Sequence, residues 1–159
     1  LTGHLVFSTL HTNDSFGALT RLIDMGIEPF LVSSSVLAVL AQRLVRVVCP
    51  DCRQSYQPTE PELVRIGLGG MRLASPIYRP AGCKACRNTG YRGRTAITEL
   101  MVMDDEIRGL VMQKADGSMI RRACAAKGMK ILRQEGAERV LAGQTTIEEL
   151  LRVTQEDFA

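Results

Sequence analysis

The first hydrophobic feature of the chain is a short apolar run over residues 3–10, which ends in the polar segment 11–15. Such a run predicts a parallel β-strand that is buried on both faces. In open α/β sheets, ligands bind beyond the carboxyl ends of the strands. A candidate ligand site is therefore formed by four polar residues, Thr9, His11, Thr12 and Asn13. The alternatives are that His11 is a hydrogen-bonding anchor and that Asp14 or Ser15 only caps the next helix.

Two helices are expected to follow this strand. The first has apolar residues at helical spacing and should end at Gly26 with a left-handed cap. The second starts at Pro29, a residue suited to the first helical turn, and its apolar positions continue to Leu40. Because this segment is apolar nearly all round, we expect it to be buried. Residues 42–48 then have the composition of a β-strand, with Arg43 and Arg46 expected at a solvated end.

The last third of the chain is predicted to be one strand followed by helices. Residues 94–101 are the strand, and helices are expected from Asp104 and over residues 119–127 and 130–143. The last helix opens with residues 146–149, Thr-Ile-Glu-Glu, which is the pattern of a capping box. Cys124 lies among small apolar residues on one of these helices, so we expect an inert, buried thiol.

A segment from Cys49 to about Tyr91 separates these two parts. It is rich in Pro and Gly and is expected to be a small module with one short helix over residues 60–66. It contains two C-x-x-C pairs that are 30 residues apart, and such pairs can wrap around one ion and supply the four thiolates of a tetrahedral site. We therefore expect zinc to be bound by Cys49, Cys52, Cys83 and Cys86. Because the protein would fill all four positions, the metal is expected to be structural.

Two other uses of these cysteines remain open at this point. Iron also accepts four thiolates, although redox work would need an electron-transfer partner that the neighbouring residues do not suggest. The second alternative is two disulfides or two redox-active pairs. Against it, neither pair is predicted to start a helix directly after a strand, which is the arrangement of a thioredoxin-like site.

Composition limits the class of protein. The 159 residues are 45% hydrophobic and 23% charged, which is typical of a globular chain with one larger and one smaller domain. The longest apolar segment, residues 29–41, is too short to cross a bilayer and is interrupted by three serines, so no direct membrane insertion is expected. Free thiols in a metal-binding pattern fit a reducing compartment, and we expect a cytoplasmic protein.

The tetracysteine segment is basic, with eight basic and three acidic side chains between Cys49 and Arg94, a net charge of +5. This charge leaves a zinc-ribbon protein that binds nucleic acid as an alternative function. Three aromatic rings there could stack on bases, Tyr56, Tyr78 and Tyr91, but a formal charge of +3 for the whole chain is small for that role. A purely structural docking module is a further alternative.

The sequence lacks an essential motif of nucleotide-hydrolysing sites. The sequence contains no Gly-x-x-x-x-Gly-Lys-Ser/Thr phosphate loop, and no Ser-His-Asp or paired-carboxylate cluster is evident. A complete nucleotide-hydrolysing site is therefore not expected, and the chain alone is not expected to be an autonomous enzyme.

Several motifs in a fixed order resemble the secretion ATPases of type II secretion and type IV pilus assembly systems. Besides the two C-x-x-C pairs, these motifs are TGHLVFSTLHTND at residues 2–14, AQRLVR at 41–46, GYRGR at 90–94 and GQTTIEE at 143–149. Their order is much more specific than any one of them, and the resemblance covers essentially the whole chain. One departure is Ala96, where relatives often have Gly, and we expect it to affect packing only.

The resemblance implies an α/β fold that is the C-terminal part of a RecA-like P-loop ATPase. Residues 1–48 would belong to the ATPase core and residues 49–91 would form the inserted tetracysteine zinc module. Residues 92–159 would form the returning strand and a helical C-terminal subdomain. The phosphate loop would then precede this chain in a longer parent protein.

The resemblance also implies a function for that parent. It would hydrolyse ATP with Mg²⁺ in a cytoplasmic hexamer that is peripheral to the inner membrane. Movements of the subunits would pass to inner-membrane platform proteins and drive pseudopilus or pilus growth and protein secretion, with no specific nucleic acid bound. The first motif would be the histidine box, in which His4 and His11 sense or stabilise the γ-phosphate. Thr9 and Arg43 would lie near the nucleotide or a subunit boundary.

Overall fold

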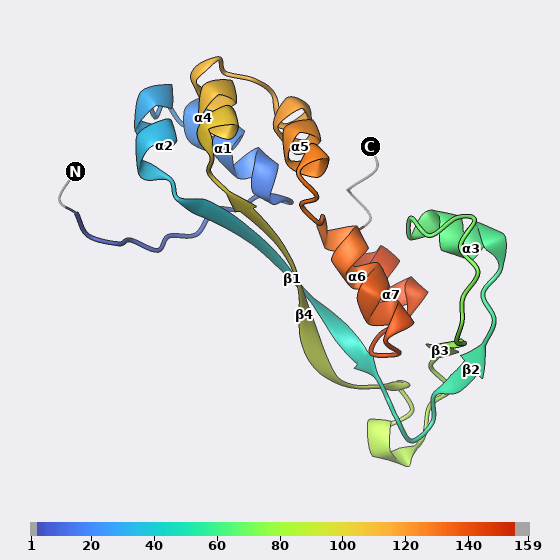
Figure 1. The fold of residues 1–159 in the computed structure, drawn as a ribbon. Helices are drawn as coiled ribbons and strands as arrows, with labels where there is room; N and C mark the ends of the chain where they lie inside the picture. The colour runs from blue at the N-terminus through green and yellow to red at the C-terminus, as the bar shows by residue number, and fades with distance from the viewer. Residues whose placement is uncertain (1–2, 155–159) are drawn as a thin grey trace. The chain divides into compact units, whose positions relative to one another are not determined.

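The computed structural model describes residues 3–154 and has a mixed helix and strand architecture, as the sequence predicts (Figure 1). The elements are α1 Ser15–Asp24, α2 Pro29–Ser35, β1 Ala38–Val48, β2 Gln54–Tyr56, α3 Glu60–Arg65, β3 Ile77–Arg79, the 3₁₀-helix η1 Lys84–Cys86, β4 Tyr91–Val102, α4 Asp105–Met112, α5 Gly117–Ala126, α6 Leu132–Leu141 and α7 Ile147–Val153. Among the described residues, no helix is long and apolar enough to cross a membrane. The chain divides into a first unit, residues 3–41 with 99–130, and a second unit, residues 42–98 with 131–154.

The longest strands, β1 and β4, pair with each other and contribute residues to both units. In the first unit, Met103 N–H donates to the Leu37 carbonyl over 2.9 Å, and in the second unit Cys49 N–H donates to the Gly90 carbonyl over 2.9 Å. The start of each strand therefore lies beside the end of the other, which makes the pair antiparallel. The strand predictions for residues 42–48 and 94–101 are confirmed.

In the first unit, a buried carboxylate fixes the start of helix α1. Asp14 caps the helix by accepting the Gly17 N–H over 2.7 Å. Glu99 reaches the next residue, Ser15, and its Oε1 accepts both the backbone N–H at 2.9 Å and the hydroxyl at 2.6 Å. Glu99 is only 2% exposed, so these bonds replace the water that the carboxylate loses. Negative charge is also favourable at a helix N-terminus.

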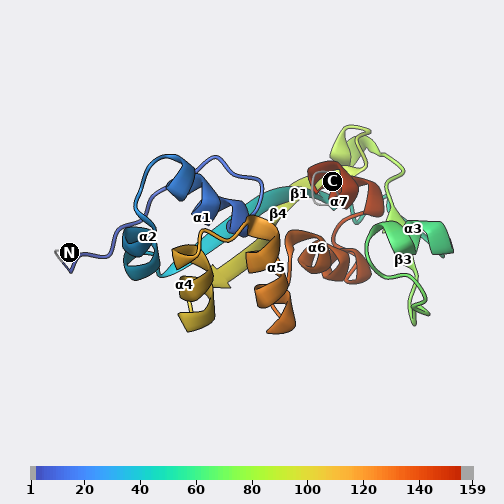
Figure 2. The ribbon, with the colours of Figure 1, turned by 90° about the horizontal axis from the view of Figure 1, so that it is seen from above.

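The helices of the first unit cover one another in pairs, with α1 against α5 and α2 against α4 (Figure 2). Asp104 caps α4, as predicted, by accepting the Ile107 N–H over 2.9 Å. Lys127 at the end of α5 forms ion pairs with Asp104 and Glu106 on the surface. Cys124 is 3% exposed, which confirms the prediction of a buried thiol, and burial raises the pKa of this group.

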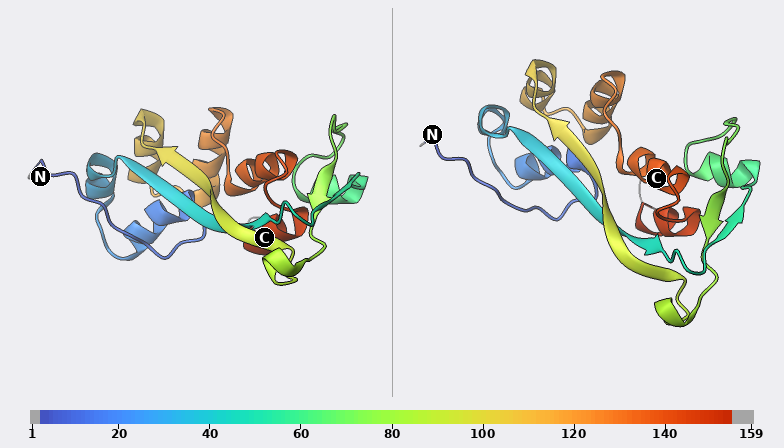
Figure 3. Two further views of the ribbon diagram at one scale, coloured as in Figure 1. Left: turned by 90° about the horizontal axis from the view of Figure 1, so that it is seen from below. Right: turned by 60° about the horizontal axis from the view of Figure 1, so that its bottom comes forward.

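In the second unit, helix α6 packs on α7 and on β3, which pairs with β2 in a small two-stranded sheet (Figure 3). These two strands are antiparallel, with Ser55 opposite Tyr78. Gly136 on α6 allows a close approach of α7, because a Cβ at this position would lie 2.1 Å from Cδ1 of the buried Leu150. The absence of a side chain therefore sets the distance between the two helices.

The edge of β1 in the second unit is held by the segment that starts α7. Glu149 accepts the Arg46 backbone N–H at 2.9 Å and the Arg46 guanidinium at 2.9 and 2.7 Å. Arg152 donates to the same carboxylate at 2.9 and 2.6 Å. Burial opposes ionisation of Glu149, but the hydrogen bonds from Arg152 and Arg46 more than offset it and lower its pKa to about 2.

Three predictions about these elements are wrong. Residues 3–10 form no strand and are exposed. A strand needs a neighbouring strand to bond to, and the described sheets consist of β1 with β4 and of β2 with β3. The second helix stops at Ser35, and Leu40 belongs to β1. This helix is also not fully buried, since Phe30 is 55% exposed.

The third correction concerns the capping box at the start of α7. Thr146 does accept the Glu149 N–H over 3.2 Å, but the Glu149 carboxylate binds Arg46 and Arg152. The carboxylate is used in a tertiary ion pair because two guanidinium groups are stronger partners than one backbone N–H.

We expect Gly136→Ala to destabilise the second unit by roughly 1–3 kcal/mol, because the added methyl group overlaps the buried Leu150 side chain. Gly109→Ala in α4 is a matched control, since a Cβ there meets no atom within 4 Å. Removing a flexible glycine from a helix should make that control more stable by about 0.5–1 kcal/mol. Urea unfolding of both variants measures the difference, and equal effects at the two glycines would contradict the close helix packing.

The stability that Glu149 contributes should depend on pH in the acidic range. Its pKa is lower in the folded protein than in the unfolded chain, so its contribution is complete above about pH 5 and is lost as the pH falls toward 2. With allowance for the exposed guanidinium groups, we expect about 2 kcal/mol to disappear. Glu149→Gln should therefore be less stable than the parent at pH 7, and the gap should narrow at pH 3. A gap that stays constant in denaturant titrations across this range would contradict the ion pair.

Candidate metal centre

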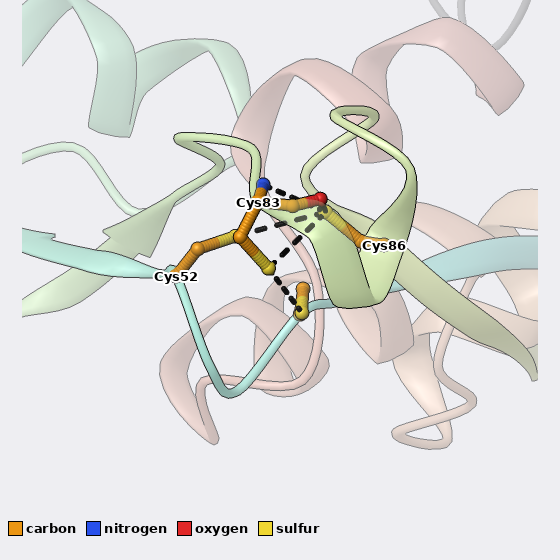
Figure 4. A group of neighbouring side chains, drawn as sticks. Cys52, Cys83 and Cys86 are labelled. Carbon is orange, nitrogen blue, oxygen red and sulfur yellow. Dashed lines mark hydrogen bonds between the residues drawn. The ribbon is translucent and has the colours of Figure 1, made fainter.

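The four cysteines of the two C-x-x-C pairs come together at one point in the second unit (Figure 4). Cys49 directly follows β1 and Cys52 lies in the turn after it, while Cys83 and Cys86 enclose η1. Their Sγ atoms all lie within 4.8 Å of one another. The separations are 4.0 Å for Cys49–Cys83, 3.9 Å for Cys52–Cys86 and 3.8 Å for Cys83–Cys86.

These distances fit a tetrahedral metal site. A tetrahedron whose arms have the zinc–sulfur length of about 2.3 Å has edges of about 3.8 Å. All five cysteines of the chain are free thiols, so the structure does not support the alternative of two disulfides. The sulfur atoms are therefore arranged as a closed set of four ligands around one position.

The second knuckle depends on an unusual backbone. Arg87, Asn88 and Gly90 all have positive φ angles, at 54°, 61° and 75°. A Cβ on Gly90 would lie 2.3 Å from Cβ of Pro80, so only glycine fits at this position. This sharp turn lets the Asn88 N–H donate to the Cys83 carbonyl over 2.8 Å and brings the Gly90 N–H to Cys86 Sγ.

Backbone N–H groups surround two of the thiols. Cys86 Sγ accepts from Cys83 N–H and Gly90 N–H, each at 3.2 Å, and Cys52 Sγ accepts from Gly82 N–H at 3.3 Å. Burial opposes ionisation of Cys86, but hydrogen bonds from the two N–H groups and from the Cys83 and Cys52 thiols more than offset it and lower its pKa to about 6. Burial raises the pKa of Cys52 to about 11. A cation bound among the four sulfurs would supply the charge that lets all of them ionise together.

The three tyrosines that could stack on bases each contact an arginine of this chain. The Arg46 guanidinium lies 4.0 Å from the Tyr91 ring centre, and Arg53 lies at the same distance from Tyr78. Arg79 lies 5.6 Å from the Tyr56 ring centre, and burial raises the pKa of Tyr56 to about 12. One face of each ring is thus occupied, which weakens the argument for a nucleic-acid-binding surface.

The residues predicted to act near a nucleotide do not lie in this cluster. His4, Thr9 and His11 are exposed on the segment before α1, in the first unit. Arg43 is half-buried in β1 and belongs to the second unit. Their roles therefore stay predictions.

Two buried glutamates that support the structure were missed from the sequence. For Glu99 there was a signal: Ile97 and Met101, two positions away on either side, share its face of β4 and are buried. For Glu149 the capping-box pattern gave a complete local explanation, so its tertiary partners Arg46 and Arg152 were not anticipated.

Comparison with known proteins places the chain in a family. A family model described as type II/IV secretion system protein matches residues 1–152. The type II secretion system protein E of Aeromonas hydrophila is 53% identical over 99% of this chain, and that of Pseudomonas aeruginosa is 52% identical over 99%. The type IV pilus assembly ATPase PilB of Thermus thermophilus is 46% identical over 98%.

The chain spans only part of these relatives, 31% of the length of the first two and 18% of the third. The match nevertheless runs without a break from the histidine-containing segment through the tetracysteine cluster to α7. The chain therefore belongs to the type II/IV secretion system protein family.

Proposed function

We propose that this chain is part of a motor protein that hydrolyses ATP to drive pseudopilus or pilus assembly and protein secretion. The observation that carries the proposal is the family match over residues 1–152, together with relatives whose names include a type IV pilus assembly ATPase. In this proposal the segment before α1 and the helices after it complete a RecA-like core. Residues 1–48 belong to the C-terminal part of that core, and residues 92–159 form the returning strand and the helical C-terminal subdomain.

The nucleotide chemistry is assigned to the histidine-containing segment. His4 and His11 stabilise or sense the γ-phosphate of ATP that is bound with Mg²⁺, because phosphoryl transfer depends on positioning and charge stabilisation. Both imidazoles are exposed and thus accessible to a ligand. Thr9 and Arg43 are assigned to the surroundings of the nucleotide or to a subunit boundary.

The motor acts as a hexameric ring in the cytoplasm, at the inner membrane, where platform proteins receive its movement. The names of the relatives, which refer to type II secretion and type IV pilus assembly, support a role in these systems. In this proposal, membrane association depends on protein partners.

The tetracysteine module, residues 49–91, binds one zinc ion as a structural metal. The sulfur separations of 3.8–4.0 Å support this choice, and four protein ligands leave no open position for water or substrate. When bound, zinc supplies positive charge that stabilises the thiolates and folding free energy for a segment with few apolar residues. The competing nucleic-acid function is disfavoured because arginines cover one face of each tyrosine ring.

For the longer protein that contains this chain, His11→Ala should lower ATP turnover by roughly 10²-fold, because a group that stabilises transferring phosphate charge is removed. The melting temperature should change little, since His11 is exposed. Gln113→Ala, an exposed residue at the end of α4, is the control and should keep normal turnover. Normal specific activity in the folded His11 variant would show that this residue takes no part in the reaction.

Metal content should depend on four of the five cysteines. We expect one zinc ion per chain in the parent and in Cys124→Ser, but less than half of that content in Cys83→Ser, where the thiolate set is incomplete. Elemental analysis of purified protein after dialysis measures the ratio. Full zinc content in Cys83→Ser would contradict the assigned ligands, and metal loss from a folded Cys124→Ser would bring an unassigned ligand into the site.

A further inference from the structure

The segment between α6 and α7 contacts the strand end from which the first metal ligand follows. The Thr145 hydroxyl donates to the Arg46 carbonyl over 2.9 Å, and Val48 N–H donates to the Gln144 carbonyl over 2.9 Å. Cys49 is the next residue after Val48, so these bonds fix the backbone immediately before a ligand. The Thr145 side chain is fully buried, which excludes water as a competing partner.

The same segment contacts the turn after the first pair of cysteines. Arg53, the residue after Cys52, donates from its guanidinium to the Gly143 carbonyl over 3.1 Å and lies over the ring of Tyr78. Gly143 has a φ of 69°, and a Cβ there would lie 2.7 Å from Cε2 of Tyr78. Hence the backbone of this segment is in close contact with Tyr78 of β3, in the strand pair that lies between the two C-x-x-C pairs in the sequence.

The strand after the second pair of cysteines is held by the same segment. The Tyr91 hydroxyl lies 2.9 Å from the Thr146 hydroxyl, and Tyr91 follows Gly90, whose N–H donates to Cys86 Sγ. Gly90 also accepts the Cys49 N–H, so the two knuckles are bonded to each other. Residues 143–149, which we call the α6–α7 connection, comprise the end of the loop after α6 and the first turn of α7. They thus contact the chain beside three places where the ligands are attached.

We infer that the α6–α7 connection positions the tetracysteine site, so that metal binding and the folding of α6 and α7 are coupled. This inference rests on the proposed zinc site and goes beyond it, because it assigns the positioning to residues that bind no metal. Thr145, Arg53 and Glu149 are the positioning residues. Thr145 and Glu149 fix the backbone of β1 shortly before Cys49, whereas Arg53 connects the turn after Cys52 to the Gly143 carbonyl. None of them contacts a sulfur in these interactions.

Coupling of this kind is reciprocal. If the connection raises the affinity for the metal, then the metal must stabilise the connection by the same factor. Coupling free energies between sites in proteins correspond to roughly 5–150-fold changes in affinity. The coupling is therefore measurable in two ways, as a change in metal affinity and as a change in the protection of the α7 backbone against hydrogen exchange.

The first experiment measures zinc affinity by competition with a chromophoric chelator. Thr145→Val keeps the shape of the side chain and removes the hydroxyl, so zinc should bind at least about 5-fold more weakly. Thr145→Ser restores the hydroxyl and should return the affinity to within about twofold of the parent. Arg53→Met should weaken zinc binding like Thr145→Val, and provides a second variant if the buried substitution does not fold. Lys127→Met in the first unit removes a surface ion pair and should leave zinc affinity unchanged.

The second experiment follows hydrogen exchange of the whole chain before and after zinc is removed by chelation. Exchange in residues 143–153 should accelerate by at least roughly 5-fold, whereas α4 in the first unit should keep its protection. Unchanged zinc affinity in folded Thr145→Val and Arg53→Met, or unchanged exchange in α7, would overturn the coupling while the zinc site stands. Absence of zinc binding by the parent would overturn the zinc site and the coupling together.

Discussion

The pairing of β1 with β4 is the constraint on which the metal centre depends. The two C-x-x-C pairs are separated by 30 residues, and closing a loop of that length has an entropic cost. The antiparallel strands bring the ends of this loop together, with Cys49 N–H bonded to the Gly90 carbonyl and Gly90 N–H bonded to Cys86 Sγ. The strand pair therefore holds the ends of this loop close together, and the sulfurs of the two pairs lie about 4 Å apart.

What could be predicted from the sequence is mainly what is decided locally. The C-x-x-C spacing fixes two ligands within one turn, and helix starts at Asp14, Asp104 and Thr146 follow from side chains that accept N–H groups three residues ahead. These elements need no distant partner. The assignment of cysteines to one cluster also succeeded, because few arrangements other than a metal site use two such pairs.

The parts that could not be predicted depend on distant residues. Residues 3–10 are apolar, but a strand exists only with a neighbour to bond, and hydrophobicity alone does not supply one. The boundary between α2 and β1 was misplaced because a short apolar run has no period that separates helix from strand. Glu99 and Glu149 bind groups 84 and 103 residues away in the sequence. Their burial therefore could not be predicted from the residues next to them in the sequence.

Each of the two buried glutamates fixes the register of a long strand, Glu99 in the first unit and Glu149 in the second. A two-stranded ribbon specifies its register weakly unless one face is committed to the interior. In the first unit, a shift of β4 by one residue would turn Glu99 outward and separate it from Ser15. In the second unit, a shift of β1 would remove the Arg46 N–H and guanidinium from the buried Glu149. A buried carboxylate without its partners is strongly unfavourable, so each glutamate excludes the shifted register by several kcal/mol. Register then decides the metal centre, because Cys49 follows β1 directly and would move away from Cys83 and Cys86 with any such shift.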